Sequence, residues 1–232
     1  MASRVKGPSL EGALFNRASS QLCKADLPLP ICRRQEAPPE LGAAQTKPKR
    51  IRFVFDVSAS MYTLQYDGRL DREVKTCLMV LEAFARADPA RFKWDMVGHS
   101  GDSASIPLVK SDKLPKTDGE RNKVLRDIIA YSMYCDSGDS TLASIRQSVQ
   151  EVAKDEADDY FVCALSDANL GRYGIGAASL GAALRTNPRV KTAIIFLDKG
   201  QESQILARQV SIAEHCPCLG MACSDRFFLY DL

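Results

Sequence analysis

Several features that mark common protein classes are missing from this chain of 232 residues. No uncharged run approaches the ~18–20 apolar residues that span a bilayer, so we do not expect a membrane protein. Its 31 Lys and Arg nearly balance 29 Asp and Glu, which argues against a nucleic-acid partner bound through bulk positive charge. There are only two histidines, and no Gly-Lys-Ser or Gly-Lys-Thr sequence occurs, so the nucleotide-binding P-loop is absent.

The eight cysteines are too few, and too irregularly spaced, for a disulfide-scaffold protein. Two of them, Cys77 and Cys163, stand inside apolar runs, where a free thiol behaves as a small hydrophobic group. The N-terminal segment lacks the uninterrupted apolar stretch of a secretory signal. We therefore expect an intracellular protein that is not secreted. An organelle transit peptide stays open as an alternative, although Pro8 and Glu11 weaken it.

The composition changes near residue 50. Residues 1–50 hold nine Lys or Arg against four Asp or Glu, together with six of the eleven prolines. Prolines at this density disfavour both helices and strand ladders. We expect residues 1–49 to form a tail with little structure, residues 50–232 to form one domain, and Lys47–Arg52 to be a short, solvated basic linker.

From residue 50 onward, strand-like and helical segments alternate. Strands are expected at 51–55, 92–97, 160–165, 190–197 and 218–223, with a short edge strand at 105–109. Apolar residues at helical spacing predict helices at 70–85, 122–133, 141–154, 180–184 and 204–213. The pattern predicts an α/β fold that is doubly wound, with a mostly parallel central sheet flanked by helices. Such sheets bind ligands at the carboxyl ends of their strands.

Polar side chains follow the expected strands at this edge. Asp56, Ser58 and Ser60 come directly after the first strand, and Asp167 follows the most apolar strand. Thr141 stands where a further helix is expected to begin, and the simplest role of Asp139, Ser140 or Thr141 is to cap that helix. Each residue alone is typical of a cap or a turn, but together they fall on one edge of a parallel sheet. Oxygen ligands with few charges suit a small divalent cation such as Mg2+.

The order of these residues resembles the metal-ion-dependent adhesion site of von Willebrand factor A domains, over roughly residues 50–200. The residues that carry the resemblance are Asp56, Ser58, Ser60, Thr141 and Asp167. It implies a Rossmann-like fold in which the three hydroxyls bind Mg2+, or alternatively Mn2+, directly, while the two carboxylates act partly through bound water. It also implies that an acidic side chain of a protein partner completes the coordination, so that the domain binds protein and is not an enzyme.

Relatives of this kind carry AAA+ ATPase modules, so the resemblance implies an AAA+ assembly as a candidate partner and the mitochondrion as a candidate location. ATP hydrolysis is not implied for this chain, because it has no P-loop. The resemblance fades after Phe196, and residues 227–230 are cut off where a last helix is expected. We therefore expect the carboxyl end to be truncated or diverged.

Four further residues are candidates for direct contact with a partner. His99 and Asp102 lie in the loop that follows the second expected strand. Arg172 and Tyr173 follow the last strand-end carboxylate, and a rigid aromatic beside an arginine is typical of an interface anchor.

Other motifs leave alternatives open. Gly98–Asp102 is a near miss to the G-x-S-x-G nucleophile elbow, which would need His215 as the base. Residues 215–223 group one histidine with three cysteines but lack the second pair typical of zinc sites. The domain could also be a scaffold or docking domain with a vestigial metal site. A metal-dependent hydrolase is less favoured, because no histidine lies in the three ligand-bearing loops.

Overall fold

The computed structural model describes residues 45–135, 138–167, 169–197, 201–212 and 220–222. Within them, six strands form one sheet in the order β3–β2–β1–β4–β5–β6. The strands are β1 (Lys49–Asp56), β2 (Phe92–His99), β3 (Ile106–Val109), β4 (Tyr160–Ser166), β5 (Val190–Phe196) and β6 (Gly220–Ala222). All neighbours are parallel except β3, which is antiparallel to β2. The order reverses between β1 and β4, because the chain first builds β2 and β3 on one side of β1 and then returns to its other side.

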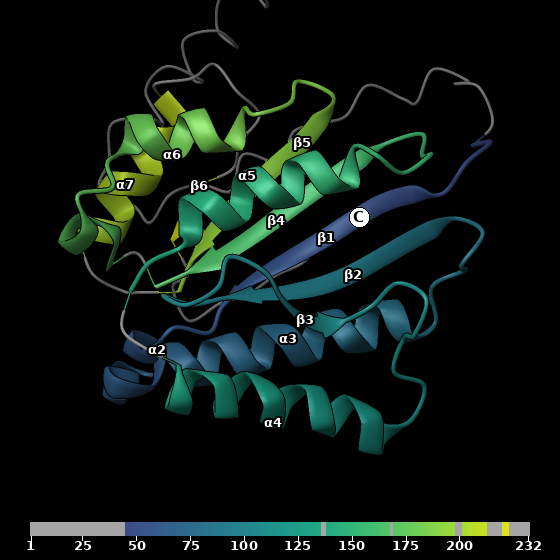
Figure 1. The fold of residues 1–232 in the computed structure, drawn as a ribbon, viewed down its shortest axis with the longest axis horizontal. Coiled ribbons are helices and arrows are strands. Elements are labelled where there is room, and N and C mark those ends of the chain that lie inside the picture. Colours follow the sequence, from purple (N-terminus) through teal and green to yellow (C-terminus); the bar gives the residue numbers. More distant parts are fainter. Residues whose placement is uncertain (1–44, 136–137, 168, 198–200, 213–219, 223–232) are drawn as a thin grey trace, which may run out of the picture. The chain divides into compact units, whose positions relative to one another are not determined.

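Helices cover both faces of this sheet. They are α2 (Ala59–Thr63), α3 (Arg69–Ala85), α4 (Asp118–Tyr134), α5 (Thr141–Val152), α6 (Ala177–Leu184) and α7 (Gln201–Ile212), with 3-10 turns η2 (Gln65–Asp67) and η3 (Asn169–Tyr173). Figure 1 shows α3 and α4 on one face and α5, α6 and α7 on the other. The doubly wound α/β fold that the sequence predicts is therefore confirmed. Among the described residues, no helix is both long enough and apolar enough to cross a membrane.

The centre of the sheet is apolar on both faces, because helices cover both of them. Phe53 and Phe55 pack into the layer formed with α3 and α4, where the ring of Phe53 meets that of Phe84 at 5.7 Å between centroids. Val54 points to the opposite face and packs with Ile145 of α5. Burial of such side chains contributes roughly 1.5–3 kcal/mol each. This rigid core fixes where the carboxyl end of β1 lies.

The start of β1 is charged yet buried, and here the sequence-based interpretation of a solvated basic linker is wrong. The guanidinium of Arg52 makes two hydrogen bonds to Asp95 of β2, at 2.9 and 2.8 Å, and Arg50 bonds the same carboxylate at 2.5 Å. Arg52 also pairs with Glu151 of α5. These arginines are strand residues because acidic partners some 45 and 99 positions away in the sequence neutralise them.

The segment before β1 also contacts the folded part. The side-chain amide of Gln45 donates to the backbone oxygen of Arg91 at 2.8 Å, and the backbone N–H groups of Thr46 and Lys47 donate to the carboxylate of Asp158 at 2.8 and 3.0 Å. Residues 1–44 lie outside the described residues. The domain boundary near residue 50 therefore stays a prediction.

Candidate metal centre

The loop after β1 brings three predicted ligands together. Asp56 ends the strand, and its Oδ1 accepts a hydrogen bond from the backbone N–H of Ser58 at 3.1 Å. Ser58 has an extended backbone (φ −72°, ψ 160°) and precedes the first turn of α2. This bend places the hydroxyl of Ser58 3.0 Å from that of Ser60. Two hydroxyls and a carboxylate therefore lie side by side at the end of the central strand.

Asp167 joins this group from the neighbouring strand. It directly follows β4, which pairs in parallel with β1, so the two carboxyl ends meet at the same edge. The hydroxyl of Ser60 donates to Asp167 Oδ2 at 2.8 Å. Hydrogen bonds thus connect four of the five predicted ligands, in the order Asp56, Ser58, Ser60 and Asp167. Both carboxylates are buried.

Thr141, the fifth predicted ligand, begins α5 and is buried. It is not the cap of that helix: the N-cap is Ser140, and the carboxylate of Asp139 accepts the Thr141 N–H at 2.6 Å. Its Oγ1 has no hydrogen-bond partner among the described residues. Buried hydroxyls almost always have one, so this atom fits a ligand to an ion or to a bound water. Figure 1 shows the start of α5 at the carboxyl edge of the sheet.

Arg69, Glu73 and His99 also lie at this edge, and the sequence patterns did not indicate a role for them in the metal site. His99 ends β2 directly beside Asp56 in register, with its Nδ1 4.0 Å from Asp56 Oδ1. Neither nitrogen of its ring has a hydrogen-bond partner among the described residues. Arg69, Glu73 and Thr76 are buried and recur at helical spacing along α3. Polar residues on the core-facing stripe of a helix are the signal that could have revealed them.

The electrostatics of the site favour a cation. Burial raises the pKa of the Asp56 carboxyl; His99 opposes this rise, and the negative charge of Asp167 adds to it. Burial also raises the pKa of Glu73 well above its usual value, and the negative charges of Asp56 and Asp167 add to the effect. Buried carboxylates that repel one another are stabilised by a nearby positive charge. Such a charge can come from a metal ion or from an arginine.

No three His, Cys, Asp or Glu side chains in the described part of the chain are grouped so that they could hold a metal by themselves. A cation here would therefore depend on hydroxyl and water oxygens, which suits Mg2+ or Mn2+ better than zinc. The zinc alternative at 215–223 falls largely outside the described residues, which omit 213–219 and 223. The same holds for His215, the base that a nucleophile elbow would need, while Ser100 itself is buried.

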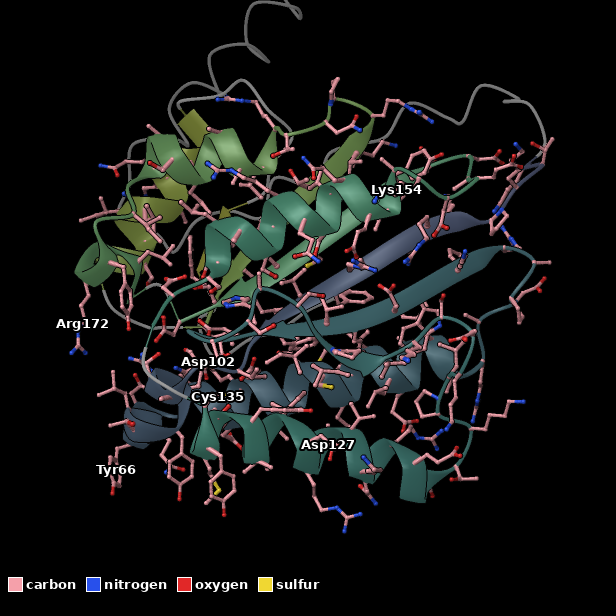
Figure 2. All side chains as sticks on the ribbon, viewed as in Figure 1. Tyr66, Asp102, Asp127, Cys135, Lys154 and Arg172 are labelled. Carbon is pink, nitrogen blue, oxygen red and sulfur yellow. The ribbon has the colours of Figure 1, made fainter. Side chains whose placement is uncertain are left out.

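The four candidate partner contacts fall into two groups. Asp102, Arg172 and Tyr173 are exposed. Figure 2 shows Asp102 and Arg172 at the end of the sheet where the candidate metal ligands lie, with Tyr66 at the same end. His99, in contrast, is 1% exposed. Its ring lies beneath this surface, which leaves the other three as the accessible members.

None of the protein-family models compared with the sequence matches it. Over 166 residues the chain is 43% identical to von Willebrand factor A domain-containing protein 8 of Mus musculus, a match that covers 71% of this chain and 9% of that protein. The chain belongs to the von Willebrand factor A domain family. Domains of this family mediate protein–protein interaction.

Solved structures similar to this von Willebrand factor A domain include three proteins. The VWA domain of SpRpn10 is 13% identical, with a TM-score of 0.44, over 77% of this chain and 90% of that one. The manganese-loaded TRAP protein of Plasmodium vivax is 13% identical, with a TM-score of 0.44, over 70% and 63%. The PilB minor pilin of Streptococcus sanguinis is 14% identical, with a TM-score of 0.49, over 75% and 56%.

Proposed function

We propose that this von Willebrand factor A domain is a non-enzymatic protein-binding module that engages an acidic side chain of a protein partner through Mg2+, with Mn2+ as the alternative ion. The residues proposed to hold the cation are Asp56, Ser58, Ser60, Thr141 and Asp167. When bound, the cation supplies an electrophilic centre for the partner's carboxylate. A set rich in neutral hydroxyls suits this role, because few anionic ligands leave the cation with unneutralised charge.

The observation that carries this proposal is the position of the unpartnered buried polar atoms. Within the described residues, the buried side-chain nitrogen and oxygen atoms without a hydrogen-bond partner belong to Arg72, Glu73, His99, Thr141 and Ser144. All five residues lie at the end of β2 or in the first two turns of α3 or α5. Such groups are rare in folded proteins and often mark a functional site or a missing ion or water. Their collection around the strand-end carboxylates supports an ion and its water shell at this edge.

The protein's own residues have separable roles in this proposal. Asp56 holds the loop by accepting the Ser58 N–H, which keeps the two serine hydroxyls 3.0 Å apart. Ser60 links this loop to Asp167 of the neighbouring strand end. Thr141 offers an oxygen that no other described group uses. Asp102, Arg172 and Tyr173 are proposed to contact the partner around the site.

The chain spans 9% of the length of the curated relative that it matches. An AAA+ ATPase assembly is proposed as the partner from the sequence resemblance alone. An intracellular location is proposed from the cysteine content, and the mitochondrion from the same resemblance.

A second function, a scaffold or docking domain with a vestigial metal site, is favoured by one contact. Arg69 Nη1 donates to Asp167 Oδ2 at 2.8 Å, so this carboxylate has a positive partner without any metal. A metal-dependent hydrolase is less favoured. The ring of His99 is close to Asp56, but it is buried where a substrate at the surface would not reach it.

Thermal unfolding of the full chain in EDTA, and in increasing Mg2+ or Mn2+, tests the metal site. Binding to the folded state alone raises stability by about 2.7 kcal/mol at a hundredfold excess over Kd. We expect a saturable increase that Asp56→Ala abolishes. The matched control is Asp102→Ala, which removes an exposed carboxylate from the same edge and should retain the increase. No stabilisation by either ion at millimolar concentration would favour the scaffold.

If the metal stabilises the chain, the next experiment tests whether a protein partner binds through it. Capture of proteins on the immobilised chain should then depend on Mg2+, be lost in EDTA and be lost in Asp56→Ala. Capture that is equal in Mg2+ and in EDTA would contradict a metal-bridged carboxylate.

A further inference from the structure

Asp167, one of the proposed metal ligands, already has a cation beside it. Its Oδ2 accepts hydrogen bonds from Arg69 Nη1 and from the Ser60 hydroxyl, both at 2.8 Å. Arg69 is 8% exposed and Asp167 is 4% exposed. The pair is therefore a buried ion pair, in which removal of one partner leaves an uncompensated charge.

Arg69 has a second carboxylate partner at the surface. Its Nε and Nη2 donate to Asp67 Oδ2 at 2.8 and 2.5 Å, and its backbone N–H donates to Asp67 Oδ1 at 2.8 Å. The guanidinium thus uses one edge for Asp67 and its remaining nitrogen for Asp167. Loss of the bond to Asp167 would leave the bonds to Asp67 in place.

We propose that Arg69 is a built-in counter-ion that competes with the metal for Asp167, so that metal occupancy and the Arg69–Asp167 bond oppose each other. This inference rests on the proposed metal site. A guanidinium within hydrogen-bond distance of a ligand carboxylate neutralises its charge and repels an incoming divalent cation. Asp67 retains the guanidinium when the metal takes Asp167. Arg69 thereby sets the affinity of the site without being a ligand.

The competition between Arg69 and the metal for Asp167 also connects the metal site to an exposed segment. Asp67 ends η2, which follows Leu64, and Tyr66 beside it is 97% exposed. Figure 2 shows Tyr66 projecting away from the ribbon at the site end of the sheet. Arg72 holds this segment against α3, because its Nη1 donates to the Asp67 backbone oxygen at 2.9 Å. A change in how Arg69 divides its bonds would therefore act on residues 64–67, next to the surface proposed for the partner.

Calorimetric titration of the full chain with Mn2+ tests this proposal through variants with opposite expected effects. Arg69→Gln removes the competing charge and should tighten Mn2+ binding roughly tenfold, because it removes a positive charge that repels the cation at close range. Asp67→Asn weakens the second partner of Arg69, which strengthens the hold of Arg69 on Asp167, and should weaken Mn2+ binding several-fold. The control Arg126→Gln removes an exposed positive charge from α4, outside the proposed site, and should change the affinity less than twofold.

The outcomes separate this inference from the metal site itself. If the unmodified chain binds Mn2+ and Asp56→Ala does not, but Arg69→Gln binds no tighter, the metal site stands and the competition is refuted. Equal tightening in Arg126→Gln would also refute it, because bulk charge would then explain the effect. If Arg69→Gln does not fold without metal, Asp67→Asn decides, and an unchanged or tighter affinity refutes the inference.

Two further outcomes apply if the unmodified chain does not bind Mn2+. Mn2+ binding that appears only in Arg69→Gln, and is lost again when Asp56→Ala is added, would support the competition in its strongest form. Absence of binding in both the unmodified chain and Arg69→Gln would overturn the inference and the metal site together.

Discussion

Glu73 provides the sharpest test of the electrostatics beneath the candidate site. It is fully buried in α3, and the usual pKa of such a carboxyl is 4.5, whereas burial and the carboxylates of Asp56 and Asp167 raise it well above that value. The folded chain therefore holds a proton that the unfolded chain releases once the pH exceeds about 4.5. Stability attributable to this group is full below that pH and falls as the pH rises, by about 1.4 kcal/mol per unit, until the folded pKa is reached.

Glu73→Gln replaces the carboxyl with a neutral group of the same shape. We expect the variant to be more stable than the unmodified chain at pH 7.5 in EDTA. The gain is at most about 4 kcal/mol, which is reached if the folded chain keeps its proton throughout the range between pH 4.5 and pH 7.5. The pH slope of stability should also be shallower in the variant. Asp56, whose pKa is also raised, keeps part of the slope.

Urea unfolding between pH 5 and 8 in EDTA measures both quantities. The matched control is Glu82→Gln, the same substitution on the same helix, where the carboxylate is exposed and pairs with Arg121 at 3.0 Å. Exposed pairs contribute about 0–1 kcal/mol, so this control should be nearly neutral and should keep the slope. A Glu73→Gln chain that is less stable than the unmodified one at pH 7.5, with an unchanged slope, would refute the reasoning.

Two further predictions concern single residues, one in the candidate metal site and one in β2. Thr141→Ala should weaken Mn2+ binding while changing the metal-free stability by less than about 1 kcal/mol, whereas Asp139→Ala, which removes the acceptor at the start of α5, should cost about 1 kcal/mol. Urea unfolding in EDTA and Mn2+ calorimetry separate the two, and equal effects of both variants on metal binding would contradict the assignment. Asp95→Ala should destabilise the chain by about 3–5 kcal/mol, because it leaves the two buried arginines of β1 short of a partner. Lys191→Ala, which breaks an exposed pair, should cost less than about 1 kcal/mol in the same urea assay.

The sequence predicts the alternation of strands and helices well, because hydrophobic periodicity and short connections decide it locally. The strand-end residues Asp56 and Asp167 are predicted to lie close together for a geometric reason. Parallel strands place their carboxyl ends at one edge, so two residues 111 positions apart must meet once the strands are recognised as neighbours. Ser60, which hydrogen-bonds to Asp167, bears this out.

The surroundings of the site could not be predicted in the same way. His99 reads as a loop residue because the apolar run of the second strand ends at Val97, yet β2 continues for two more residues and pairs with the whole end of β1. Arg50 and Arg52 read as a linker because nothing local shows that Asp95 will face them. In both cases the residue that determines the local structure lies on another strand, so the pattern of a single segment cannot predict it.

The two functions considered for this domain differ in what neutralises Asp167. In a vestigial site Arg69 does so permanently, and the Asp67 bonds merely orient its guanidinium. In a working site the same arginine lets the empty domain stay folded, since Asp167 is never left buried and unpaired, and the affinity for metal is lowered by the energy of the bond that must be given up. The Arg69–Asp167 contact therefore favours the vestigial site only if Arg69 has no other carboxylate to bind when it leaves Asp167. The bond to Asp67 does bear on the choice, because a guanidinium that keeps a carboxylate partner after leaving Asp167 makes the exchange far less costly than the loss of a buried ion pair.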